Sequence, residues 1–132
     1  MQNLKLPITI DPYKSAQRRL VCDGYFESSG MNRLLAACES ISEQVKVTVK
    51  FDVDEQGLIS IRGSGSASVT LPCQRCNEPF AQELNIEFCF SPVKNEEKAA
   101  ELPSFYDAIE FDENGEVNLR ELVEDELLLE IP

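Results

Sequence analysis

The sequence predicts an α+β fold, in which an antiparallel β-sheet, open or curled into a partial barrel, packs against two main helices. Apolar and polar residues alternate over 45–52 and again over 84–90, which is typical of strands with one buried face. Apolar residues recur at helical spacing near 30–42 and near 118–129, so we expect a helix in each stretch. The 132 residues suit one domain, 1–132.

The N-terminal third is predicted to begin with a short strand or extended arm over 6–10. A helical turn around Lys14 and a strand over 19–26 should follow. Ser28 and Ser29 are both suitable N-caps for the helix near 30–42, because a serine hydroxyl can accept a bond from the first free amides.

The middle of the chain gives the clearest β signal. The strand that begins at Val45 should turn at the polar residues 54–57 and return as a long strand over 58–71. Gly63 and Gly65 in that long strand indicate a bend or a bulge. A knuckle-like connection over 72–79 should then lead into a further strand.

The composition shifts after Ser91-Pro92. Residues 94–104 are charged and bounded by prolines, so we expect a surface loop or a frayed helix there. A short strand over 108–111 and a turn over 113–115 should precede the last helix. Asn118 is a suitable N-cap for that helix, and Glu121 three residues later resembles a capping box.

The formal net charge of −12 is unevenly distributed along the chain. Residues 1–50 carry a net +2, residues 51–95 a net −3 and residues 96–132 a net −11. A strongly negative surface repels phosphate backbones and favours a basic protein as partner. Six residues are candidate contacts for RNA or for a protein partner: Arg18, Arg19, Arg75, Glu121, Glu124 and Asp125.

The chain contains no histidine. This removes the commonest general base near neutral pH and every nucleophile that depends on an imidazole. Most of the carboxylates lie in a charged run where solvation is the expected state. The sequence therefore predicts a protein that binds a partner and is not an enzyme, with no small-molecule substrate.

Cys73 and Cys76 form a CxxC motif, the sharpest motif in the chain. The pair could be reduced structural thiols, half of a zinc site or a redox disulfide. Zinc would need two further ligands, taken from Cys22, Cys38, Cys89, a carboxylate or a second copy of the chain. Five cysteines are an odd number, and neither a signal peptide nor a membrane-spanning stretch is evident, so we expect a cytoplasmic protein with no membrane partner.

Four segments, taken together and in order, resemble the YceD family of large ribosomal RNA subunit accumulation proteins. They are Leu6-Pro7…Asp11-Pro12, Val69-Thr70-Leu71-Pro72-Cys73-Gln74-Arg75-Cys76, Phe88-Cys89-Phe90-Ser91-Pro92-Val93 and Val123-Glu124-Asp125-Glu126. The resemblance implies ribosome biogenesis: a role in the synthesis, processing or stability of large-subunit ribosomal RNA, without enzymatic activity. A large-subunit ribosomal protein or precursor ribosomal RNA is the implied partner. Family chains usually continue past the Leu-Leu-Leu-Glu-Ile-Pro ending, often with further cysteines, so the family's C-terminal tail is expected to be missing here.

Overall fold

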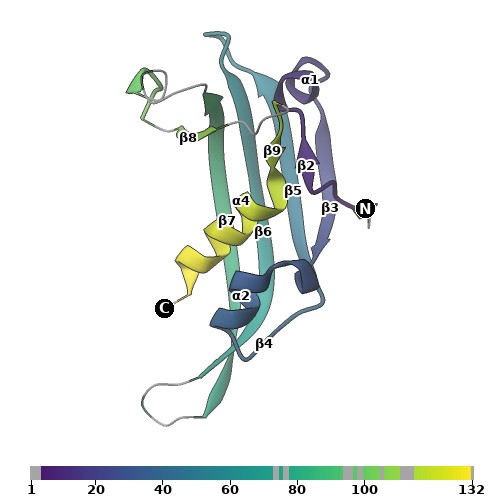
Figure 1. The fold of residues 1–132 in the computed structure, drawn as a ribbon, viewed down its shortest axis with the longest axis vertical. Helices are drawn as coiled ribbons and strands as arrows, with labels where there is room; N and C mark the ends of the chain where they lie inside the picture. Colours follow the sequence, from purple (N-terminus) through teal and green to yellow (C-terminus); the bar gives the residue numbers. More distant parts are fainter. Residues whose placement is uncertain are drawn as a thin grey trace.

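The fold is an elongated sheet with helices packed on one of its faces (Figure 1). This computed structural model describes residues 4–72, 75, 78–93, 97, 100–104, 106–110 and 115–131. The strands are β1 (Leu4–Lys5), β2 (Thr9–Ile10), β3 (Val21–Glu27), β4 (Ser40–Ile41), β5 (Gln44–Val53), β6 (Ile59–Pro72), β7 (Pro79–Val93), β8 (Asp107–Glu110) and β9 (Val117–Asn118). The α-helices are α1 (Pro12–Gln17), α2 (Asn32–Ala37) and α4 (Leu119–Glu130), and η1 (Ser28–Gly30) is a 3-10 helix.

Strands β5, β6 and β7 form the antiparallel centre of the sheet, as the alternating pattern predicts. In β5 the residues that face the helices are Val45, Val47, Val49 and Phe51, and all four are buried. The polar turn between β5 and β6 is stabilised by Asp54, whose carboxylate accepts bonds from the amides of Gln56 and Leu58. Asp54 also accepts a 2.8 Å bond from the hydroxyl of Tyr106.

Of the two forms expected for the sheet, the open one is found and the partial barrel is wrong, because the path of paired strands is open. The main sheet has the order β1-β3-β5-β6-β7-β8, with β4 paired to β6, and β2 pairs separately with β9. The β1–β3 and β7–β8 pairs are parallel, so the sheet is mixed although mostly antiparallel. Helices α2 and α4 lie across the apolar face (Figure 1), so this face is buried without the sheet rolling up.

No bulge occurs at Gly63 or Gly65, because the pairing of β6 with both neighbours runs through them without a break. The glycines make room for backbone carbonyls of β5 and for side chains of β7 instead. A β-carbon at position 63 would overlap the carbonyl oxygen of Thr48 and lie 2.6 Å from the ring of Phe88. At position 65 it would lie 3.3 Å from Ile86. The backbone of β5 and these two side chains therefore fill the space that a larger residue would need.

The first helix of the helical layer is shorter than expected and is capped differently. Ser28 and Ser29 lie in η1 and are not N-caps of α2, which begins only at Asn32. Its N-cap residue, Met31, makes no side-chain cap bond. The helix ends at Ala37, because the following residues extend and Ser40–Ile41 pairs with β6 as β4.

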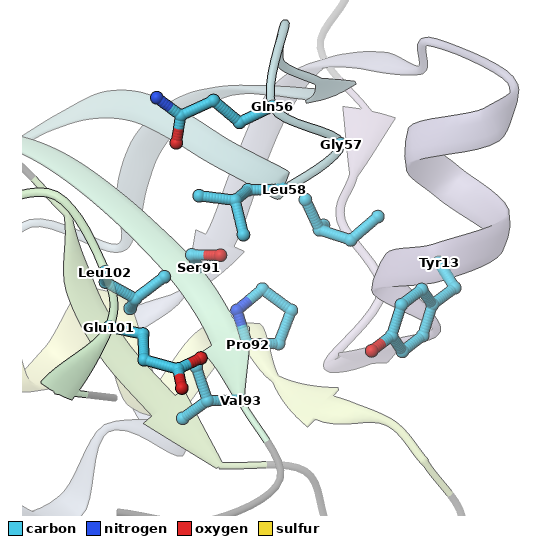
Figure 2. A pocket seen from close by; sticks show the side chains of 10 residues that line it. Tyr13, Gln56, Gly57, Leu58, Ser91, Pro92, Val93, Glu101 and Leu102 are labelled. Carbon is cyan, nitrogen blue, oxygen red and sulfur yellow. The ribbon is translucent and has the colours of Figure 1, made fainter. Parts of the chain in front are cut away.

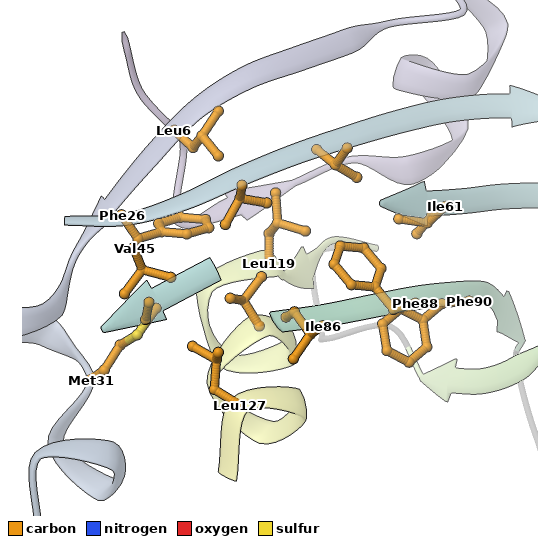
Figure 3. Close-up of a cluster of buried hydrophobic side chains, with 14 of the residues drawn as sticks. Leu6, Phe26, Met31, Val45, Ile61, Ile86, Phe88, Phe90, Leu119 and Leu127 are labelled. Carbon is orange, nitrogen blue, oxygen red and sulfur yellow. The ribbon is translucent and has the colours of Figure 1, made fainter. Parts of the chain in front are cut away.

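The last helix, α4, follows the sequence prediction closely. Asn118 is its N-cap and accepts a 2.8 Å bond from the amide of Glu121. Leu119, Val123 and Leu127 are fully buried against the sheet. Figure 3 shows Leu119 and Leu127 pointing into the same cluster as residues of β3, β5, β6 and β7. Within the strand or arm predicted over 6–10, only Thr9–Ile10 forms a strand, β2; the short strand β1 precedes this range, and Leu6 between the two strands is buried.

Candidate functional site

The C-terminal half of α4 and the neighbouring edge of β7 enclose a groove of about 440 Å³. We call it the acidic groove, because three of its six lining residues are glutamates. It is lined by Asn85, Ile86, Glu87, Glu126, Leu129 and Glu130. Leu129, on the last turn of α4, is 77% exposed. The groove therefore combines negative charge with an apolar contact point.

The acidic groove is electrostatically strained around Glu126. Partial burial raises the pKa of this carboxyl group, and the charges of Asp107, Asp125 and Glu130 raise it further. None of the ion pairs found among the described residues involves Glu87, Glu126 or Glu130. Like charges held together without a cation favour any positive group that can enter the groove.

Two of the three predicted acidic contacts, Glu124 and Asp125, bind other residues of the protein itself. Glu124 is only 6% exposed; it accepts a 3.0 Å bond from Arg33 and a 3.1 Å bond from the backbone amide of Leu34. Asp125 pairs with the same arginine at 2.6 Å. Glu121 lies exposed in the first turn of α4. Glu124 and Asp125 thus connect α4 to α2, and Glu124 supplies the cap that Met31 does not provide.

The predicted cationic contacts do not form one cluster. Arg18 and Arg19 follow α1, at the opposite end of the molecule from the β6–β7 hairpin that carries Arg75 (Figure 1). Arg19 has a positive φ of 50° and lies 3.7 Å from Asp52. All three arginines are exposed.

A separate group of cations lies on the face of the sheet that the helices leave uncovered. Lys46 and Lys50 alternate with the buried valines of β5, and Arg62 is the cross-strand partner of Lys50. Beyond Arg62, the outer face of β6 carries the small side chains of Ser64 and Ser66. The outer face therefore changes from cationic on β5 to anionic on β7.

Cys73 and Cys76 lie outside the described residues, so their predicted role as metal ligands stays a prediction. The other three cysteines are free and partly buried, and burial raises the pKa of the thiols of Cys22, Cys38 and Cys89. A raised pKa disfavours the reactive thiolate. No group of three or more potential metal ligands occurs among the described residues.

A pocket of about 360 Å³ lies beside the β5–β6 turn, between the start of α1 and the end of β7. Its lining is mostly apolar, and Figure 2 shows Leu58, Pro92, Val93 and Leu102 around it. Tyr13 and Glu101 are the ionisable side chains among the residues that line it.

Sequence reasoning did not single out Glu87, Glu126 and Glu130. The spacing of Glu126 and Glu130, four residues apart, was a usable signal because such residues share a helix face. Glu124 and Asp125 differ from these residues because both pair with Arg33. This arginine lies 91 residues away from Glu124 in the chain. That distinction requires the tertiary structure.

Comparison with known proteins gives one consistent result. Residues 61–132 match the family model described as "Large ribosomal RNA subunit accumulation protein YceD". A Haemophilus influenzae protein of the same name is 46% identical over 132 residues, which cover 100% of this chain and 76% of that protein. No solved structure matches the chain. None of the helices in the described part of the chain is long and apolar enough to cross a membrane.

Proposed function

The chain belongs to the YceD family, and from this premise we propose that it supports large-subunit ribosomal RNA accumulation by binding a basic large-subunit ribosomal protein. The family is named for an accumulation factor and not for an enzyme, which agrees with a chain that has no histidine. The observation that carries the proposal is the acidic groove, where Glu87, Glu126 and Glu130 meet beside an exposed Leu129.

The groove suits a protein partner better than a nucleic acid. Three carboxylates would repel a phosphate backbone, whereas lysine and arginine side chains would neutralise them. The exposed Leu129 offers an apolar contact of the kind found at the centre of protein interfaces. A chain with a net charge of −12 would also attract basic partners from a distance and speed their association.

The test is recovery of large-subunit proteins from lysate by the immobilised chain, at low and at high salt. We expect salt-sensitive recovery of basic large-subunit proteins, and loss of that recovery in the variant Glu87→Lys/Glu126→Lys/Glu130→Lys. The matched control is Glu39→Lys/Glu43→Lys/Glu55→Lys, which makes the same charge change at three exposed positions. Equal recovery by both variants would contradict a role for the groove, and no recovery of such proteins at low salt would contradict the proposal itself.

Direct binding of precursor ribosomal RNA is a second candidate, favoured by the outer cations Lys46, Lys50 and Arg62. These residues lie together on an uncovered sheet face, although Arg18 and Arg19 lie elsewhere. Replacing Lys46 and Lys50 by glutamine should lower the salt dependence of RNA binding by about 1 to 2 in log–log slope. An unchanged slope would argue against this face, and replacement of Arg18 and Arg19 by glutamine tests the sequence-based candidates in the same way.

A further inference from the structure

The edge of β7 is open over much of its length. Strand β8 pairs with β7 only over Phe90–Val93, and no other described strand pairs with that edge. Figure 1 shows nothing alongside the rest of this edge except the end of α4, which crosses in front of it. In an antiparallel pair every second residue directs its amide and carbonyl away from its neighbour. The segment 82–89 therefore presents a row of backbone donors and acceptors on its free side.

The open edge forms one wall of the acidic groove. Ile86 faces the helices, whereas Asn85 and Glu87 lie on the outer face, and all three line the groove with the end of α4. Glu83 lies exposed on the same outer face as Glu87, two positions beyond Asn85. An added strand would thus have α4 carboxylates on one side and strand carboxylates on the other.

The charges on this edge disfavour a second copy of the chain as its occupant. Two β7 strands paired antiparallel about Asn85 would place Glu83 of each strand opposite Glu87 of the other. Like charges directly opposite each other destabilise a strand pair. Charged side chains on an edge are a common means of preventing such self-association.

We propose that residues 82–89 of β7 bind an extended, lysine- or arginine-rich segment of a protein partner as an additional strand. The inference rests on the proposed function and specifies the mode of binding. Strand addition would supply affinity through backbone hydrogen bonds, and the flanking carboxylates would supply selectivity for basic side chains. Alternate side chains of the added strand would face Glu126 and Glu130, and the remaining ones would lie beside Glu83 and Glu87.

The test uses the full chain and a ten-residue probe of alternating lysine and threonine with blocked termini. Its control is the same peptide methylated at every backbone nitrogen, which keeps the charge but cannot donate hydrogen bonds to a strand edge. Affinities are measured at low salt, and amide hydrogen exchange of the chain is followed by NMR with and without the probe.

We expect the unmodified probe to bind at least tenfold more tightly than the methylated control. It should also slow the exchange of alternate amides within 82–89, since those that point away from β6 would become bonded. The variant Glu87→Lys/Glu126→Lys/Glu130→Lys should lose binding at least tenfold, whereas Glu39→Lys/Glu43→Lys/Glu55→Lys should retain the protection of β7.

Equal affinity of the two peptides would overturn strand addition while leaving charge-based binding of a basic protein intact. Binding without protection of the β7 amides would overturn it as well, and so would failure of both peptides to bind. A single-stranded RNA oligonucleotide serves as the second ligand in the same assay. Protection of the same alternate amides by that RNA, and not by the peptide, would assign the edge to nucleic acid and overturn the proposal.

Discussion

The two sides of helix α4 carry similar acidic residues in opposite circumstances. On the side that faces α2, Glu124 and Asp125 share Arg33, and Glu124 also receives the amide of Leu34. On the side that faces β7, Glu126 and Glu130 have no cationic partner among the described residues, and partial burial together with nearby carboxylates raises the pKa of Glu126. Four acids within seven residues thus serve two purposes, since one pair stabilises the fold and the other is available to a partner.

The comparison teaches that net charge is a poor guide to a binding surface. The net charge of −11 on residues 96–132 includes carboxylates that pair with cations inside the fold. The informative acids are those whose repulsion is left unrelieved, because ionisable groups with perturbed pKa values cluster at functional sites. Four substitutions can break or sharpen this distinction.

The largest effect is expected from Glu124→Ala, on the neutralised side. It removes two hydrogen bonds to a buried carboxylate and leaves the Leu34 amide without its partner, so unfolding should become easier by about 2–3 kcal/mol. Glu121→Ala, an exposed acid on the same helix, should change stability by less than about 0.5 kcal/mol. Urea denaturation of both variants measures the difference, and equal stabilities would contradict a structural role for Glu124.

Arg33→Ala should destabilise the protein less than Glu124→Ala. The arginine side chain is half exposed, so much of its pairing is screened, and the bond from Leu34 to Glu124 survives its removal. We expect the loss to shrink further at high salt, measured by thermal unfolding at two ionic strengths. If Arg33→Ala lowered the stability more than Glu124→Ala, the buried carboxylate of Glu124 would be stabilised mainly by Arg33.

Glu130→Lys should stabilise the fold while weakening partner binding. A lysine four residues after Glu126 makes a favourable pair, and α4 has no basic residue in its last turn to complement the helix dipole. Together these effects should raise the free energy of unfolding by about 0.5–1 kcal/mol. Recovery of basic proteins should nevertheless fall, and a variant that is more stable and binds equally well would show that Glu130 is not part of the site.

Glu126→Gln should give the smallest effect, with a characteristic pH dependence. Because the folded-state pKa of Glu126 lies above its usual 4.5, the folded state binds more protons than the unfolded state as pH rises through that range. The wild-type protein therefore loses stability there, and the glutamine variant should be more stable by about 0.3 kcal/mol at neutral pH. This gain should vanish below pH 4.5, and a gain that is independent of pH would contradict the electrostatic explanation.

The sequence was sufficient where a local pattern determines the structure. Alternation placed β5, β6 and β7, and the Asn118 cap with its apolar stripe placed α4 within one or two residues. The sequence was not sufficient where contacts between residues far apart in the chain determine the structure. Gly63 is required by the carbonyl of Thr48 and the ring of Phe88, on the two neighbouring strands, and not by a bulge, and the sheet remains open because helices cover it.

The candidate site was predictable only in part for the same reason. The composition indicated an acidic C-terminal region and a basic partner, but the predicted contacts included Glu124, which the structure buries. Helix periodicity groups Glu126 with Glu130, yet nothing local shows that they face Glu87 across an open strand edge. The CxxC pair, which was the clearest motif, lies outside the described residues and stays a prediction.

The carboxylate of Glu124 also makes two distant segments mechanically dependent on each other. Helix α2 has six residues, too few to persist without external support, and its first turn is secured by a side chain from α4. Any displacement of α4 toward an incoming strand would withdraw that support and loosen α2. Binding of a strand at the open edge of β7 would then destabilise residues 32–37. Amide hydrogen exchange in α2 would therefore become faster when a partner binds, although the partner does not contact α2.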